Sequence, residues 1–143
     1  MPVTVRQLFD ANRESLQLTW LAGEAGAGRD IAPVRAAPAD LLGYLNLIHP
    51  SRLHVFGHAE TDYYLHMEPP RRHAILDDMV SGKPPAVVVC EGIAPAPELL
   101  ARGQAAQLPL LASPQPGARV IDALRSWLAK ATADATSMHG VFM

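Results

Sequence analysis

The sequence predicts an α/β domain with a mixed, partly parallel sheet flanked by helices. After residue 50, short apolar runs alternate with longer segments whose apolar residues recur at helical spacing. The runs "AVVVC" at 86–90 and "LPLLAS" at 108–113 are continuously apolar, as strands are when helices cover both faces of a sheet. Strands that alternate with helices in this way are typical of α/β domains with parallel strands.

The chain opens with a predicted helix and a predicted strand. Thr4 and Gln7 have the spacing of a capping box, so we expect a helix over Thr4–Asn12. The segment "LQLTWL" at 16–21 alternates apolar and polar residues, which predicts a strand. We expect this strand to add antiparallel pairing to the sheet.

A glycine loop follows, with Gly23, Gly26 and Gly28. A phosphate cradle would need a Lys-Ser/Thr pair and the start of a helix after the glycines, and the sequence offers neither. We therefore interpret the loop as a turn between strands. Beyond it we expect a short strand at Ile31–Val34 and a helical turn or two starting near Pro38.

The second half alternates strands and helices more regularly. A strand is expected at 52–57, before the two apolar runs already named. Proline pairs and apolar residues at helical spacing delimit four helices. These helices are expected at 59–67, from Pro69 to the Pro84-Pro85 pair, at 97–107 and at Gly117–Thr132.

Charge and composition exclude several classes of partner. The net charge is −2 and the basic residues are scattered, so we expect no nucleic-acid partner. The apolar runs are too short to span a bilayer, so we expect no membrane partner. The N-terminus lacks a basic region followed by an apolar stretch, so we expect no signal peptide. Cys90 is the single cysteine, which precludes an internal disulfide and fits a cytoplasmic protein.

Residues capable of catalysis or metal binding are present, but their pattern favours structural roles. The six histidines form no H-E-x-x-H motif, and we interpret them as surface or half-buried residues. We interpret Cys90 as a small buried apolar group. Glu60 and Asp62 suit the dipole at the start of a helix. We therefore assign no catalytic and no metal-binding residue.

One location remains a candidate for ligand binding. Three predicted strands end at Gly57, at Glu91-Gly92 and at Ser113, and each is followed by a turn and a helix. If the strands are parallel, these junctions lie along one edge of the sheet, where ligands of open α/β sheets bind. We call this region the candidate edge, and it consists of Gly57, His58, Glu60, Gly92 and Ser113.

Several segments, in order and spacing, resemble the N-terminal domain of bacterial HPr kinase/phosphorylase. They are "VTVRQLFD", "GEAGAGRDI", "LLGYLNLIHPSRLHVFGHAETDYYL", "PAVVVCEGIAPAPELL", "LPLLASP" and "TSMHGVFM". The resemblance covers about Val3 to Met143 and implies a fold like the N-terminal domain of Mur ligases. It implies that 1–132 is one α/β domain, and that 133–143 is a linker followed by the start of a P-loop kinase domain.

The full-length family phosphorylates a serine of HPr, the sugar-phosphotransferase carrier, and removes that phosphate by phosphorolysis. The resemblance implies a cytoplasmic homohexamer that regulates carbon use, with ATP and Mg²⁺ acting in its kinase domain. The motif G-x-x-x-x-G-K-[ST] occurs nowhere in these 143 residues, so we expect no cofactor and no phosphoryl transfer here. The expected partners are HPr, the parent's own kinase domain and further copies of the parent.

Two departures from the family pattern bear on the candidate edge. Relatives often carry Thr-Arg where this chain has Cys90-Glu91, and Ser/Thr where it has Gln115-Pro116-Gly117. Both changes remove donors or positive charge, which disfavours an anionic ligand.

Two alternative functions stay open: a free-standing sensor of a nucleotide or nucleotide-sugar, and a small metal-dependent hydrolase that uses the histidines.

Overall fold

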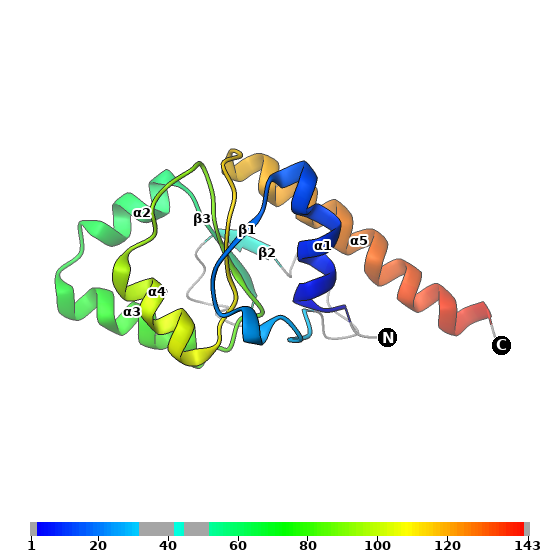
Figure 1. Ribbon diagram of the computed structural model, residues 1–143, viewed down its shortest axis with the longest axis horizontal. Helices are drawn as coiled ribbons and strands as arrows, with labels where there is room; N and C mark the ends of the chain where they lie inside the picture. The colour runs from blue at the N-terminus through cyan, green and yellow to red at the C-terminus, as the bar shows by residue number, and fades with distance from the viewer. Residues whose placement is uncertain (1–2, 32–41, 45–51, 142–143) are drawn as a thin grey trace.

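The computed structural model describes residues 3–31, 42–44 and 52–141. Helices and strands alternate along this part of the chain (Figure 1). The elements are α1 (Val5–Leu16), β1 (Thr19–Ala22), the 3₁₀ turn η1 (Glu24–Gly26), β2 (Leu42–Tyr44), β3 (Leu53–Phe56), α2 (His58–Leu65), α3 (Pro69–Ser81), β4 (Val87–Val89), α4 (Pro97–Ala106), β5 (Leu110–Ala112) and α5 (Gly117–Val141).

The strands of the described residues form one five-stranded sheet in the order β1-β5-β4-β3-β2. The four strands from β2 to β5 are parallel, whereas β1 lies at one edge and runs antiparallel to β5. The predicted α/β class with a mixed sheet is therefore confirmed. The antiparallel strand pairs with the last strand of the chain, and its ladder shifts register between Trp20 and Ala22.

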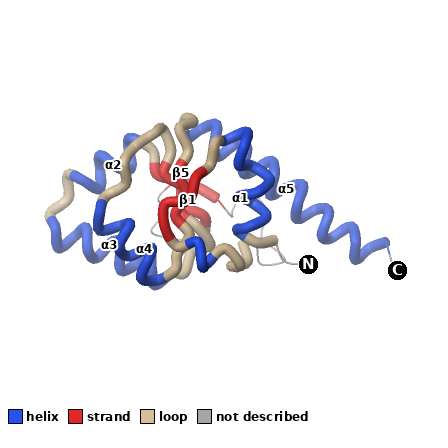
Figure 2. Tube along the Cα trace, viewed as in Figure 1, coloured by secondary structure: helices blue, strands red, loops and turns tan. Residues whose placement is uncertain are grey.

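Helices cover both faces of this sheet (Figure 2), with α1 and α5 on one side and α2, α3 and α4 on the other. Side chains alternate across each strand, so consecutive apolar residues feed two separate cores. Val88 and Leu111 pack in the core with α1 and α5. Val87 and Val89 pack in the core with α2, α3 and α4. This arrangement explains why the central strands have apolar residues at consecutive positions of their sequence.

Local signals fix the ends of several helices. The predicted capping box is confirmed: the Gln7 N–H donates to Thr4 Oγ1 at 3.3 Å, and the Thr4 N–H donates to Gln7 Oε1 at 2.9 Å. Proline stands in the first turn of α3 and of α4. Backbone N–H groups in the first turn of a helix make no intrahelical hydrogen bond, so proline, which has no N–H, is well tolerated there. These caps explain why the N-termini of the helices were predictable from sequence.

Arg29 joins the loops at the end of the sheet opposite the candidate edge. Its guanidinium donates to the carbonyls of Pro84 and Ala106, each at 2.9 Å. Pro84 lies between α3 and β4, and Ala106 ends α4, so one side chain holds three segments together. Burial lowers the pKa of Arg29 from its ordinary value. This contact could not be predicted from the sequence, because the partners of Arg29 are distant backbone carbonyls.

One expected element is wrong, and another is tested only at its first residue. Leu42–Tyr44 lies in β2, not in a helical turn, because it pairs in register with β3. Ile31 lies outside any strand, although its N–H donates to the Val3 carbonyl at 2.7 Å, and the rest of Ile31–Val34 lies outside the described residues.

The C-terminal segment also differs from expectation. The helix expected to end at Thr132 continues to Val141, through residues expected to form a linker. Alanines alternate through this stretch and no proline interrupts it, which favours a continuous helix. In Figure 1 the last turns of α5 project beyond the body of the domain. Phe142 and Met143 lie outside the described residues, and the predicted division at 132/133 into domain and linker stays a prediction.

Candidate functional site

The three strand ends named from the sequence lie side by side. Phe56 pairs with Val89, and Val89 pairs with Ala112, so β3, β4 and β5 finish at the same level. Gly57, Cys90 and Ser113 are the residues that follow directly. The candidate edge is thus one continuous region of the described structure. Whether it binds a ligand stays a prediction.

Two carboxylates occupy the start of α2 at this edge. The His58 N–H donates to Glu91 Oε1, and the Gly57 N–H donates to Glu60 Oε1, both at 3.4 Å. These N–H groups are the donors that would otherwise receive an anion at a helix N-terminus. The chain therefore supplies its own anions, and an added anionic ligand would have to displace Glu91 against the repulsion of two negative charges.

The imidazole of His58 lies on the solvent side of these carboxylates. Its side chain is 69% exposed, and its Nε2 lies 3.9 Å from Glu91 Oε1. An ion pair this exposed contributes roughly 0–1 kcal/mol when the histidine is protonated. His58 therefore adds little to the rigidity of the candidate edge.

Ser113 has a structural role at the candidate edge. The side chain is buried, with 2% relative exposure. Its hydroxyl donates to the Leu16 carbonyl at 2.6 Å and accepts from the Gln115 N–H at 3.1 Å. The hydroxyl thus ties the end of α1 to the turn before α5. Because this hydroxyl already donates one hydrogen bond and accepts another, it is poorly placed to act as a nucleophile.

The turn after β4 is held by backbone hydrogen bonds to the turn after β5. The Glu91 N–H donates to the Gln115 carbonyl at 2.9 Å, and the Gly92 N–H donates to the Ser113 carbonyl at 3.3 Å. Both residues adopt left-handed conformations, with φ of 63° at Glu91 and 68° at Gly92. This conformation is costly for a non-glycine residue such as Glu91, by about 1–2 kcal/mol.

Cys90 is buried beneath the same turn, as predicted. Burial, followed by the negative charges of Glu91 and Glu60, raises the pKa of the thiol to about 12. Nucleophilic cysteines require the opposite environment, one that favours the thiolate. Cys90 is therefore a packing residue of the core that faces α1 and α5.

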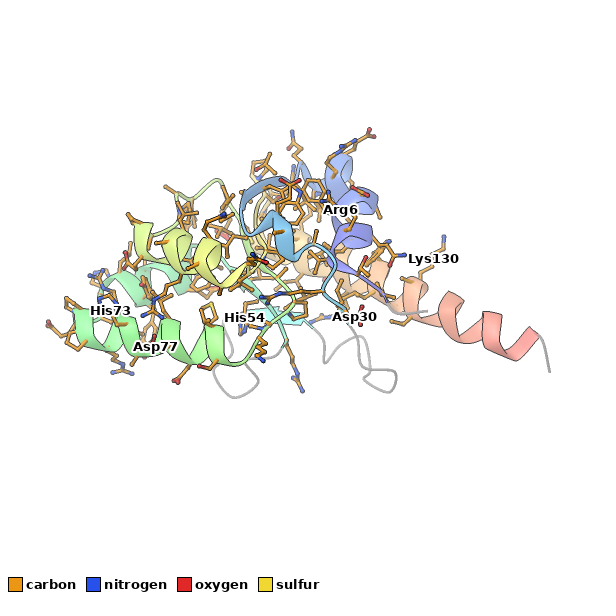
Figure 3. The ribbon with its side chains drawn as sticks, turned by 60° about the horizontal axis from the view of Figure 1, so that its bottom comes forward. Arg6, Asp30, His54, His73, Asp77 and Lys130 are labelled. Atoms are coloured by element: carbon orange, nitrogen blue, oxygen red, sulfur yellow. The ribbon has the colours of Figure 1, made fainter. Side chains whose placement is uncertain are left out.

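The histidines whose side chains the structure describes do not gather into a site. Within the described ranges, no group of three or more His, Cys, Asp or Glu residues could hold a metal ion. Figure 3 shows His54 inside the molecule and His73 far from it on α3. His54 is fully buried in β3, so the interpretation of every histidine as surface or half-buried was wrong for this residue. A strand central to the sheet buries both of its faces, whatever the residue type.

Sequence reasoning also missed a polar cluster beyond the candidate edge, between α2, α3 and α4. The Tyr64 hydroxyl donates to Glu98 Oε1 at 2.8 Å, and the Arg72 guanidinium lies 3.8 Å from the same oxygen. The Arg72 guanidinium carbon also lies 5.8 Å from the centre of the Tyr64 ring. Burial, and then the hydrogen bond and charge of Glu98, raise the pKa of Tyr64 above its ordinary value. The hydrogen bond from its own backbone N–H, and then that from Tyr64, lower the pKa of Glu98.

The fold and the candidate edge define a small α/β domain built on one five-stranded, mostly parallel sheet within the described residues. No helix of that part is long and apolar enough to cross a membrane. The chain belongs to the family described as HPr Serine kinase N terminus, whose model matches residues 3–128.

Similar proteins carry the name HPr kinase/phosphorylase. This chain is 41% identical over 141 residues to that of Bordetella petrii, and 40% identical over 145 residues to that of Ralstonia nicotianae. It is 37% identical over 145 residues to that of Paraburkholderia phymatum. Each similarity covers 99% of this chain but only 46%, 45% and 45% of the respective relative. The chain therefore spans less than half the length of the curated relatives that it matches.

Proposed function

We propose that this chain serves as the non-catalytic N-terminal domain of an HPr kinase/phosphorylase, with a regulatory or assembly role. The observation that carries the proposal is the match of 99% of the chain to less than half of each relative, together with a family model of the N terminus. In such a parent, HPr would be the protein substrate. ATP and Mg²⁺ would act in a separate kinase domain, and the parent would be a cytoplasmic homohexamer.

The chemistry of the chain supports a non-catalytic role. Phosphoryl transfer in P-loop enzymes uses backbone N–H groups and a lysine around the phosphates, and a hydroxyl on the metal ion. The sequence has no such motif. At the candidate edge, the N–H groups at the start of α2 already bind carboxylates, and the Ser113 hydroxyl is engaged by backbone groups. This arrangement also disfavours the alternative of a nucleotide or nucleotide-sugar sensor.

The shape of the domain supports a role in connecting or assembling parts of a larger protein. The first half of α5 is anchored in the core through Val120, Leu124 and Leu128. Its last turns leave the body of the domain (Figure 1). A rigid helix anchored in this way can transmit the position of the domain to a neighbouring kinase domain, which we propose as its direct partner.

The proposal makes two separable claims, and the first concerns catalysis. Purified chain is incubated with HPr and Mg²⁺, together with ATP or pyrophosphate, and phosphoserine on HPr is measured by mass spectrometry. We expect none, whereas the Bordetella petrii relative, as positive control, should produce it. Phosphoryl transfer by this chain would overturn the claim.

The second claim concerns assembly and regulation. A shortened Bordetella petrii relative, without the region that aligns with this chain, is compared with the intact relative. We expect phosphoryl transfer to persist while the number of subunits, obtained as the molar mass from light scattering divided by the mass of one chain, or the response of activity to metabolites, changes. If both properties were unchanged in the shortened protein, a regulatory or assembly role would be excluded.

A further inference from the structure

Three helices, α2, α3 and α4, pack in the core that contains Val87 and Val89, and α2 buries the fewest residues of the three. Only Tyr64 of its eight residues is buried, whereas α3 buries Ile75, Leu76 and Met79. In the described part of the chain, the exposed large apolar residues are Tyr63, at 60%, and Leu65, at 49%, and both belong to α2. Little apolar burial therefore opposes the separation of α2 from the sheet.

A small cavity lies beneath this helix. Its lining is almost entirely apolar, and its volume is about 20 Å³. The lining residues are Phe56, Thr61, Tyr64, Leu76, Val89, Pro95, Ala96 and Leu99. A void of this kind deprives the underside of α2 of dispersion contacts, which further weakens its attachment.

Polar contacts hold α2 at its two ends. Toward its C-terminal end, the Tyr64 hydroxyl donates to Glu98 of α4 at 2.8 Å. At its N-terminal end, the His58 N–H donates to Glu91 at 3.4 Å. The helix is bounded by Gly57 on one side and by the turn at Met67 before Pro69 on the other. Flexible glycine and a short turn are suitable hinges.

We propose that α2 is a lid that opens as one unit, latched by the hydrogen bond between Tyr64 and Glu98. Opening moves His58 and Glu60 away from Gly92 and Ser113, so the candidate edge is assembled only when the lid is closed. The latch joins Tyr64, near the C-terminal end of α2, to α4, whereas His58 stands at the opposite end of α2. Breaking or weakening the hydrogen bond between Tyr64 and Glu98 therefore changes how often the candidate edge is assembled, because it changes the position of α2.

Amide hydrogen exchange followed by NMR on the whole 143-residue chain tests this proposal. Thr61 and His66 report on the two ends of α2, since their N–H groups donate to the carbonyls of Gly57 and Asp62 at 3.0 and 3.1 Å. A helix of eight residues that has left its tertiary contacts is not stable in water, so opening of the lid unwinds α2 and exposes both amides. In Tyr64→Phe, which removes a hydrogen bond to a charged acceptor, we expect exchange at both amides to accelerate about tenfold or more. Amides inside α3 and α4 should keep their rates.

Tyr63→Phe is the matched control, because it removes the same hydroxyl from the exposed neighbouring residue. It should leave all rates unchanged. Glu98→Gln weakens the latch from the other side and should accelerate the same two amides by a smaller factor. Glu91→Ala loosens the opposite end, and a lid that opens as a unit should then exchange faster at His66 as well as at Thr61.

Three results would overturn the proposal. Acceleration at His66 alone in Tyr64→Phe would mean that the end of the helix frays without opening as a unit. Equal acceleration throughout α2, α3 and α4 would mean that only global unfolding exposes α2. Unchanged rates at both amides in Tyr64→Phe and in Glu98→Gln would mean that this hydrogen bond is no latch.

Discussion

The Oε1 atom of Glu91 lies 3.4 Å from the backbone nitrogen of His58, at the start of α2. Glu91 reaches this position from a left-handed backbone conformation, immediately after a buried strand. The carboxylate takes the place that an anionic ligand would take in a binding domain of this class. The contact therefore bears on both the stability and the binding properties of the candidate edge.

Replacing Glu91 should separate the effect of its side chain from that of its backbone. Glu91→Ala and Glu91→Gly both remove the carboxylate, but only glycine adopts φ of 63° without strain. We expect Glu91→Gly to be more stable than Glu91→Ala by about 1 kcal/mol. Urea unfolding followed by tryptophan fluorescence measures the difference. An alanine variant as stable as the glycine variant would show that the turn is unstrained.

The glycine loop should tolerate one substitution and reject another. A Cβ on Gly23, where φ is 71°, would lie 2.0 Å from the Leu108 carbonyl oxygen. A Cβ on Gly28 would meet nothing within 4 Å. We expect Gly23→Ala to lower the free energy of unfolding by about 3 kcal/mol and Gly28→Ala to change it by less than about 0.5 kcal/mol. Similar melting curves for both variants would contradict the predicted close approach of the loop to Leu108.

Arg29 should contribute to stability through its planar guanidinium. Lysine cannot reach both the Pro84 and the Ala106 carbonyls, because it carries its donors on one nitrogen. We expect Arg29→Lys to lower the free energy of unfolding by about 1–3 kcal/mol. Arg13→Lys, at an exposed position in the last turn of α1, should change it by less than about 0.5 kcal/mol. Chemical denaturation of the two variants side by side checks the prediction, and equal stabilities would refute it.

Stability should fall at alkaline pH. The pKa of Cys90 is raised from 9.0 to about 12, and that of Tyr64 is raised from 10.0, so the folded state retains protons that the unfolded state loses. The free energy of unfolding therefore decreases as pH rises above about 9. Cys90→Ala should flatten this dependence between pH 9 and 10, where Tyr64 contributes less. Denaturation midpoints measured from pH 7 to 11 test this, and an unchanged slope in Cys90→Ala would assign the effect to other groups.

The fold class was predictable because local pattern and tertiary packing agree over much of the chain. Continuous apolar runs such as Val87–Val89 favoured strands covered on both faces, and proline in first turns marked the start of α3 and α4. Leu42–Tyr44 was missed because its pairing with β3, not its local sequence, makes it a strand. The length of α5 was missed because an alanine-rich polar stretch was interpreted as a linker, despite its helix propensity.

At the candidate edge, the sequence predicted the location but not the chemistry. The parallel order of the strands is enough to place Gly57 and Ser113 along one edge. It could not show that Glu91 would turn back onto α2, or that Ser113 would bind the end of α1. Likewise, the pairing of Tyr64 with Glu98 joins residues far apart in sequence. Such contacts follow from the packed structure, and short motifs carry no signal for them.

The pairing of β1 with β5 has a consequence for biosynthesis. Thr19 lies opposite Ala112, so the strand made early has no partner until most of the domain has been made. Translation proceeds from the N-terminus, and contacts between distant residues slow folding. Leu8, Phe9 and Trp20 pack in the core that also contains Leu111 and Leu124, and they lack these later neighbours during this interval. The nascent chain thus keeps an apolar segment partly exposed until β5 emerges.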